Sequence, residues 1–194
     1  MSDYQPAWVN AVLQFWFEEL SDADWFVRDD AIDDRIRKRF LSLHGHITAD
    51  GGVPLTSTPR MLLAAVLVLD QFSRNLYRDD PRAFESDADA RHLAHSIVEQ
   101  GLDVAMTPQE RFFVYLPFEH SENANDQALA VRLIAALGND YWTRYAVDHQ
   151  ATIARFGRFP FRNAALSRVS TADEVAYMNE STKGARALTP TLSR

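Results

Sequence analysis

An unbroken apolar run over residues 61–69 constrains the fold of this chain more than any other feature. Thr58 and Pro59 precede the run, and this pair is typical of a helix start. The threonine oxygen can cap free amides, and proline at the first helical position has no amide to leave unpaired. At roughly 100° per residue the apolar run covers the whole circumference of a helix. We therefore predict a central helix, beginning near Arg60, that other helices surround on all sides.

The same helix becomes half polar past Leu69. Asp70 falls in line with apolar residues of the preceding turns, where a carboxylate needs a cation or several hydrogen-bond donors. Arg74 follows one turn later and can answer that charge. Two interpretations remain open: a structural Asp70–Arg74 ion pair, or a polar face that lines a cavity. That face carries Asp70, Gln71, Arg74, Asn75 and Arg78.

Apolar residues at helical spacing predict further helices along the chain, and no alternating strand pattern of useful length occurs. The helices are expected at about residues 6–20, 30–43, 60–78, 86–100, 108–123, 125–137, 140–156 and 171–179, with a kink or an end at Pro117. Short connections favour antiparallel neighbours. We predict an all-α fold of about eight helices, stacked in pairs as in tetratricopeptide-repeat proteins.

Length and charge narrow the class of protein. A chain of 194 residues fits one domain, which we place at residues 1–180, followed by a loosely ordered tail at 181–194. No apolar run approaches the ~20 residues of a membrane span, and the acidic start MSDYQPAW is unlike a secretory signal. We expect a cytoplasmic protein without a membrane partner. The net charge of -7 disfavours a nucleic-acid partner, whose phosphates require a basic surface.

The absence of cysteine removes disulfides, thiolate nucleophiles and cysteine-ligated metals. Chemistry must therefore use carboxylates, histidines, arginines and hydroxyls. Two histidine pairs could hold a metal, His44 with His46 in a predicted loop and His92 with His95 on a predicted helix, but neither has an evident third ligand. We predict no metal site and no cofactor.

Two further segments combine aromatic residues with charges. Glu119, His120 and Glu122 follow Pro117, where a helix break re-aims side chains and exposes backbone groups. The segment at residues 155–163 interleaves phenylalanines with four polar residues. These are Arg155, Arg158, Arg162 and Asn163.

Three segments together resemble an uncharacterised bacterial family, domain of unknown function 924. They are LDQFSRN at residues 69–75, YLPFEHSE at 115–122 and RFGRFPFRN at 155–163, and FWFEEL near the start is similar to the family's opening. The resemblance covers nearly the whole chain. It implies a helical fold similar to tetratricopeptide-repeat proteins in a bacterial cytoplasmic protein, and it implies no established activity. The family pattern has histidine where this chain has Phe161, and often proline where it has Ser73.

We hypothesise that the three segments converge on one concave polar pocket with aromatic walls. Three functions are compatible with it. The pocket could bind the carboxylate or phosphate of a small molecule or peptide end, through Asp70, Gln71, Arg74, Asn75, Arg155, Arg158, Arg162 and Asn163. It could catalyse hydrolysis or isomerisation, with His120 as acid or base oriented by Glu119 or Glu122. The charges could also form a purely structural network.

Overall fold

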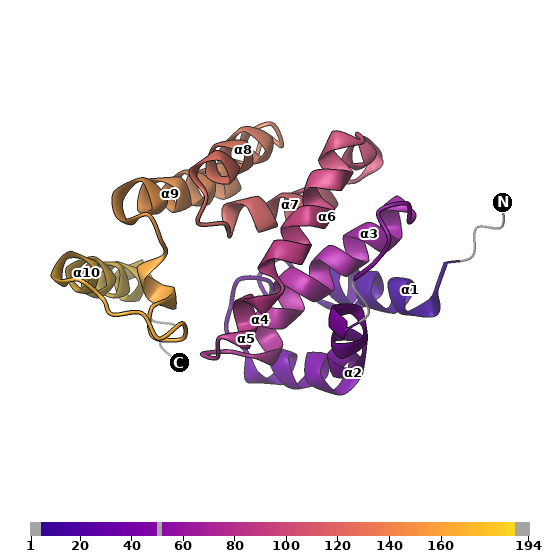
Figure 1. The fold of residues 1–194 in the computed structure, drawn as a ribbon, viewed down its shortest axis with the longest axis horizontal. Coiled ribbons are helices and arrows are strands. Elements are labelled where there is room, and N and C mark those ends of the chain that lie inside the picture. The colour runs from indigo at the N-terminus through magenta and orange to yellow at the C-terminus, as the bar shows by residue number, and fades with distance from the viewer. Residues whose placement is uncertain (1–4, 50–51, 189–194) are drawn as a thin grey trace.

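The computed structural model describes residues 5–49 and 52–188, which contain helices and no strand (Figure 1). The α-helices are α1 (Ala7–Gln14), α2 (Asp30–Ala49), α3 (Pro59–Val66), α4 (Ser73–Leu76), α5 (Arg82–Glu85), α6 (Asp87–Glu99), α7 (Pro108–Glu119), α8 (Ala124–Ala135), α9 (Asp140–Phe156) and α10 (Ala172–Leu188). Two π-helical segments, η1 (Phe15–Glu19) and η2 (Leu67–Phe72), and two 3₁₀ segments, η3 (Leu102–Ala105) and η4 (Pro160–Arg162), complete the described helices. The backbone stays helical from α1 into η1 and from α3 through η2 into α4. The described residues thus hold eight long helices and the short α5, which confirms the all-α prediction.

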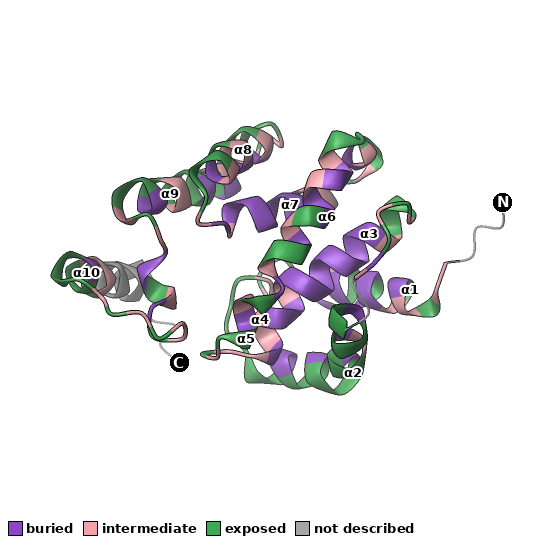
Figure 2. Cartoon of the chain, viewed as in Figure 1, coloured by how far each residue is buried: buried purple, intermediate pink, exposed green. Residues whose placement is uncertain are grey.

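The central helix lies where the apolar run predicts it. Residues 62–69 are at most 1% exposed, and α3 packs against α1, α6 and α7. Figure 2 shows α3 buried along most of its length, whereas α2 is exposed on its outer side. Successive helices continue the packing, α6 on α7, α7 on α8 and α8 on α9. The likeness to a tetratricopeptide-repeat superhelix stays a prediction.

Both threonine–proline pairs begin helices as expected. The Thr58 side chain accepts a hydrogen bond from the Met61 amide, which caps α3. Thr107 accepts from the Glu110 amide, and the Glu110 side chain accepts from the Thr107 amide, so α7 begins with a capping box. These local signals are readable in the sequence because each uses residues only three positions apart.

The central helix differs from prediction in its second half, where Leu67–Phe72 is π-helical. A π segment widens one turn of a helix and changes which side chains share a face. The Ser73 hydroxyl donates to the Leu69 carbonyl at 2.6 Å, and His44 Nε2 lies 2.8 Å from the same hydroxyl. Because the hydroxyl proton is used on the carbonyl, His44 Nε2 is the donor in this second bond. Asp70 lies within the widened turn.

Two other boundaries correct the sequence prediction. Helix α2 continues to Ala49, so His44 and His46 lie on a helix and not in a loop. The buried His44 ring contacts Ser73 and Tyr77, and this tertiary packing outweighs the low helix propensity of Gly45. Pro117 lies inside α7, which ends at Glu119 with His120 as its C-cap. The expected break is therefore displaced by two residues, and His120 stands at the helix end.

The C-terminal region only partly falls within the described residues. Helix α10 runs to Leu188, beyond the end expected near residue 179. It packs against η4, and its Tyr177 contacts the end of α9 through Thr152 and Phe156. The single domain at residues 1–180 and the loose tail at 181–194 stay predictions, and residues 189–194 lie outside the described part of the chain. Within the described residues no helix is both long and apolar enough to cross a membrane.

Replacing Phe72 by alanine should destabilise the fold strongly. The Phe72 ring is fully buried and contacts the rings of Phe15, Trp16 and Phe40. Truncating a buried phenylalanine removes transfer energy and leaves a cavity, so we expect a loss of about 3–5 kcal/mol in urea unfolding. The matched control is Phe161→Ala, at a side chain that is 57% exposed, where a change within about 0.5 kcal/mol is expected. Equal effects of the two changes would contradict the central packing described above.

Candidate functional site

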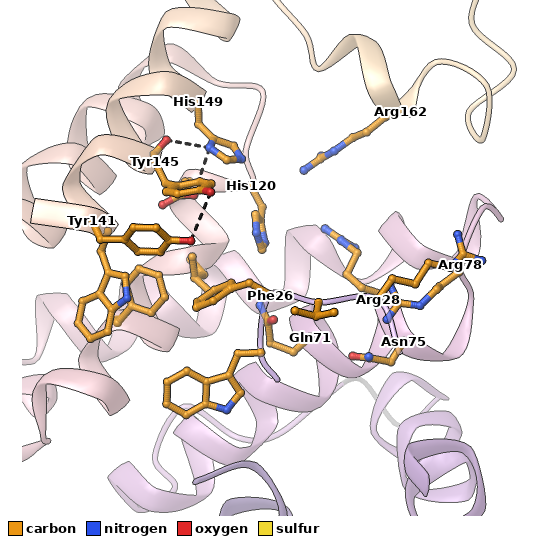
Figure 3. A pocket seen from close by; sticks show the side chains of 17 residues that line it. Phe26, Arg28, Gln71, Asn75, Arg78, His120, Tyr141, Tyr145, His149 and Arg162 are labelled. Carbon is orange, nitrogen blue, oxygen red and sulfur yellow. Dashed lines mark hydrogen bonds and ion pairs between the residues drawn. The ribbon is translucent and has the colours of Figure 1, made fainter. Parts of the chain in front are cut away.

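A cavity of about 530 Å³ opens where segments distant in the sequence meet (Figure 3). Its walls come from the loop at residues 25–28, from η2 and α4, from α7, from α9 and from η4. One side is aromatic and includes Phe26, Tyr141 and Tyr145, whereas the opposite side is rich in arginine. The volume lies within the range usual for small-molecule sites, roughly 300–1,000 Å³.

The Asp70 carboxylate and the His120 ring join two of the predicted motifs directly. His120 Nδ1 lies 2.7 Å from Asp70 Oδ1, and Gln71 Nε2 donates to Asp70 Oδ2 at 2.5 Å. Asp70 is 1% exposed and His120 20% exposed. Burial by itself would raise the pKa of Asp70, but His120, Arg74 and the Gln71 hydrogen bond outweigh burial and hold this pKa below its usual value. Asp70 is therefore ionised at neutral pH, and it orients the ring.

The orientation of His120 follows from that charge. An ionised carboxylate only accepts hydrogen bonds, so Nδ1 carries the proton of this contact and, in the neutral ring, Nε2 has a free lone pair. No described residue forms a hydrogen bond with Nε2, and the ring lines the cavity. The sequence hypothesis named Glu119 or Glu122 as the orienting group. The structure corrects this, because the π-helical segment brings Asp70 behind the ring while both glutamates make other contacts.

Glu119 instead approaches a histidine that the sequence analysis missed. Glu119 Oε1 lies 3.3 Å from His149 Nδ1, and His149 Nδ1 donates to the Tyr145 carbonyl at 2.9 Å. Burial raises the pKa of Glu119 to about 7, with the nearby Asp70 charge adding to the shift and His120 opposing it. Burial also lowers the pKa of His149 to about 4. Between pH about 4 and pH about 7, this short contact therefore joins two uncharged groups and is no ion pair.

Two arginines share one carboxylate at the polar wall. Arg74 donates to both oxygens of Asp87, at 2.8 and 2.9 Å, and also to the Ala83 carbonyl. Its contact with Asp70 is longer, 3.9 Å, so the expected Asp70–Arg74 pair is secondary. Arg162 reaches the same Asp87 only at 3.6 Å. Burial, and then the repulsion of Arg74, lower the pKa of Arg162 to about 10, which leaves it charged at neutral pH.

The Arg162 guanidinium is held by aromatic rings and not by hydrogen bonds. It lies over Phe84 and Phe159, at 4.9 and 4.5 Å from the ring centroids. No described residue accepts a hydrogen bond from it, and its side chain is 15% exposed. Figure 3 shows it extending from η4 into the cavity towards His120. Its N–H groups are therefore available to a ligand.

Six of the eleven predicted site residues line the cavity, and Asp70 lies directly behind His120. Those six are Gln71, Arg74, Asn75, Glu119, His120 and Arg162. The Asn75 amide and Arg78 both donate to Asp33, which leaves less of this part of the wall open to a ligand. The roles assigned to these residues in binding or catalysis stay predictions.

The other four predicted residues, Glu122, Arg155, Arg158 and Asn163, do not line the cavity and have partners elsewhere. Arg158 donates to both oxygens of Glu174, at 2.6 and 2.8 Å, and Asn163 reaches the same carboxylate at 3.3 Å. Arg155 lies over Phe156, 4.6 Å from its ring centroid. Glu122 accepts from the Phe159 amide and from Arg168. The expected convergence therefore holds for Arg162 but not for this group.

The aromatic wall could have been found in the sequence from a spacing of four. Tyr141, Tyr145 and His149 recur at that interval and so share one face of α9. None of these three residues was among the predicted site residues. The two tyrosines are about half exposed and line the cavity beside His149. Trp25 and Phe26 complete the wall from a loop, where no periodicity reveals such a role.

Comparison with known proteins places this arrangement in a family. The sequence matches the family described as "Bacterial protein of unknown function (DUF924)" over residues 12–182. The chain belongs to the DUF924 family. A solved structure of a protein of unknown function from Agrobacterium tumefaciens has a TM-score of 0.81 and 32% sequence identity, and the match covers 89% of this chain and 97% of that one. No curated protein matches the sequence.

The two positions at which the resemblance predicts a departure from the family pattern, Phe161 and Ser73, are not part of the cavity lining. Phe161 is 57% exposed and contacts the Tyr177 ring on the far side of η4. Ser73 is buried and bonds the Leu69 carbonyl. Neither difference removes a side chain from the cavity. The described residues also contain no cluster of three or more His, Cys, Asp or Glu side chains suited to a metal ion.

Replacing Glu119 by glutamine should change how stability depends on pH. A carboxyl group with a higher pKa in the folded than in the unfolded chain favours the protonated folded state. The folded chain therefore loses stability as pH rises from 4.5 to about 7. That difference corresponds to about 3 kcal/mol. Relative to the wild type, Glu119→Gln should gain stability on this scale in urea unfolding between about pH 5 and pH 8.5.

The matched control is Glu99→Gln, since Glu99 is 76% exposed and its charge is solvated. This variant should show no comparable gain at high pH. A difference between Glu119→Gln and the wild type that stays constant across the pH range would contradict the raised pKa of Glu119.

Proposed function

We propose that this DUF924 protein binds a small anionic molecule, or the anionic end of a peptide, in the cavity. The observation that carries the proposal is the Arg162 guanidinium, which enters the cavity without a hydrogen-bonded partner among the described residues. An arginine presents five N–H donors in a planar fork that matches a carboxylate or phosphate. Burying such a group without acceptors is costly, and an anionic ligand would supply them.

A purely structural charge network accounts less well for this residue. Arg74 and Arg158 each donate hydrogen bonds to both oxygens of one carboxylate, as structural arginines do. Asp87 accepts from Arg74 with both of its oxygens and comes no nearer than 3.6 Å to Arg162, so it does not satisfy the N–H groups of Arg162. Glu119, which is protonated below pH about 7, adds little negative charge to repel an anion there. The charges at this wall of the cavity therefore favour the binding of one more negatively charged group, which a ligand would supply.

The aromatic wall indicates what else the ligand carries. Phe26, Tyr141 and Tyr145 are each about half exposed and face the polar side of the cavity. Exposed aromatic rings that line a hollow offer apolar area and stacking surface to a bound molecule. We therefore expect a ligand with an acidic group at one end and an aromatic or apolar body. The proposal includes a cytoplasmic location, and the net charge of -7 argues against a nucleic-acid partner.

Isothermal titration with phenyl phosphate and phenylacetate tests this function. Both probes combine one anionic group with one ring, and benzylamine serves as the cationic control. We expect the anionic probes to bind and Arg162→Ala to weaken them at least about tenfold, because charge-assisted hydrogen bonds are lost. Arg162→Lys should fall between the two, since it keeps the charge but not the fork.

The matched control variant is Arg155→Ala, because Arg155 lies near Arg162 in the sequence but outside the cavity. It should leave the affinity unchanged. Binding of benzylamine as tight as that of the anionic probes, or equal affinities of wild type and Arg162→Ala, would overturn the proposal.

A further inference from the structure

The Asp70–His120 pair has a feature that ligand binding alone does not require. A buried, ionised carboxylate stands directly behind an imidazole whose other nitrogen lies at the cavity. The carboxylate fixes which nitrogen holds the proton, and it would stabilise the positive ring formed when Nε2 takes up another. Figure 3 shows the His120 ring between Tyr145 and Arg162, so this nitrogen, the aromatic wall and the free cation meet in one space.

Other histidines of the chain show what a structural histidine looks like here. His44 is buried and uses Nε2 on the Ser73 hydroxyl. His149 donates Nδ1 to a backbone carbonyl, and its carboxyl neighbour Glu119 is mostly uncharged below pH about 7. His95 lies 3.5 Å from Asp126 but does not line the cavity. Among the histidines that line the cavity, His120 is the one backed by an ionised carboxylate.

The composition of the cavity wall narrows the chemistry. Its lining residues include no serine, threonine or cysteine, so they offer no aliphatic hydroxyl or thiol as a nucleophile. They do offer a base, His120, and a cation, Arg162. A base next to a cation suits removal of a proton from carbon, because the cation stabilises the negative charge that then develops. Such a proton transfer needs no reactant other than the substrate itself.

We propose, on the basis of the proposed anion binding, that the cavity is the active site of a proton-transfer enzyme acting on a small carboxylate with a neighbouring carbonyl group. His120 Nε2 removes a proton from the carbon next to that carbonyl. Asp70 is a positioning residue that holds the ring and balances its charge, and Arg162 binds the carboxylate and the developing enolate oxygen. This makes the protein an isomerase-type enzyme for 2-oxo acids or closely related compounds.

The step balances within the site. The C–H bond breaks and its proton goes to His120 Nε2, while the electron pair forms a carbon–carbon double bond. The π electrons of the carbonyl move to its oxygen, which becomes the enolate. The imidazolium then returns a proton to either end of the enolate system, which completes an isomerisation or an exchange. Asp70 stays ionised throughout and receives no proton.

Hydrogen exchange of phenylpyruvate in deuterated water tests this proposal. The compound carries a carboxylate and an aromatic ring, and its methylene protons lie next to a carbonyl. Proton NMR follows the loss of the methylene signal, and titration calorimetry measures binding on the same samples. We expect the wild type to exchange these protons well above the buffer rate. His120→Gln should fall about 100-fold or more, towards the buffer rate, while binding phenylpyruvate within about threefold of the wild type.

Two further variants make the test specific. His92→Gln changes an exposed histidine outside the cavity and should exchange like the wild type. Asp70→Asn should lower the exchange rate at saturating phenylpyruvate at least about tenfold, with the half-saturating concentration within about twofold of the wild type. A merely structural Asp70 would change both values or neither. If Asp70→Asn does not fold, His120→Gln still decides the question, because His120 is 20% exposed and Asp70 only 1% exposed.

The outcomes separate this proposal from the binding function. Phenylpyruvate that binds the wild type without exchange above the buffer rate overturns the catalytic proposal alone. Exchange by His120→Gln at the wild-type rate overturns it as well. If phenylpyruvate, phenylacetate and phenyl phosphate all fail to bind, both the binding proposal and the catalytic proposal are overturned.

Discussion

The contact between Asp70 and His120 is the interaction around which this molecule is organised. Asp70 carries a charge directly after the apolar run of the central helix and is 1% exposed. An unpaired charge there would cost several kcal/mol, so the surrounding residues must provide for it. His120, Gln71 and, at longer range, Arg74 do so. This requirement links the end of α7 to the middle of the central helix, and the cavity opens beside that link.

The second constraint is an unequal distribution of carboxylates among the arginines. Glu174 accepts hydrogen bonds from two nitrogens of Arg158 and from the Asn163 amide, so the charges of Arg158 and Glu174 are paired with each other. Asp87 accepts two hydrogen bonds from Arg74 and makes only a 3.6 Å contact with Arg162. The first arrangement ties η4 to α10, and the second leaves one cation directed into open space. Arg158 and Arg162 thus lie four residues apart, yet the first is paired with a carboxylate and the second is not. The difference follows from where the backbone places each side chain, since the residue type is the same.

Much of the fold could be predicted because its signals are local. The apolar run at residues 61–69, the Thr58 and Thr107 caps and the helical spacing of apolar residues each depend on positions within a few turns. The extension of α2 past His44 could not be predicted in this way, since it depends on contacts with Ser73 and Tyr77. The π-helical turn at Asp70 was missed for the same reason.

For the site, the sequence could predict which charged side chains need partners, but not which partners they find. The sequence indicated that Asp70 and His120 could not be left isolated, and they do meet. It could not tell Arg162 from Arg158, because their separation depends on the path of η4 after the left-handed Gly157. Nor did it reveal His149, whose carboxyl partner lies on another helix.

The position of Arg162 in the chain also has a consequence for the order in which the cavity is completed. Arg162 lies on η4, between Arg158 and Asn163, and both of these neighbours are anchored by Glu174 of α10. During synthesis from the N-terminus, Asp70 and His120 emerge well before that anchor exists. A nascent chain can therefore assemble its aromatic wall and its imidazole early, yet it acquires a fixed cation only after α10 has left the ribosome.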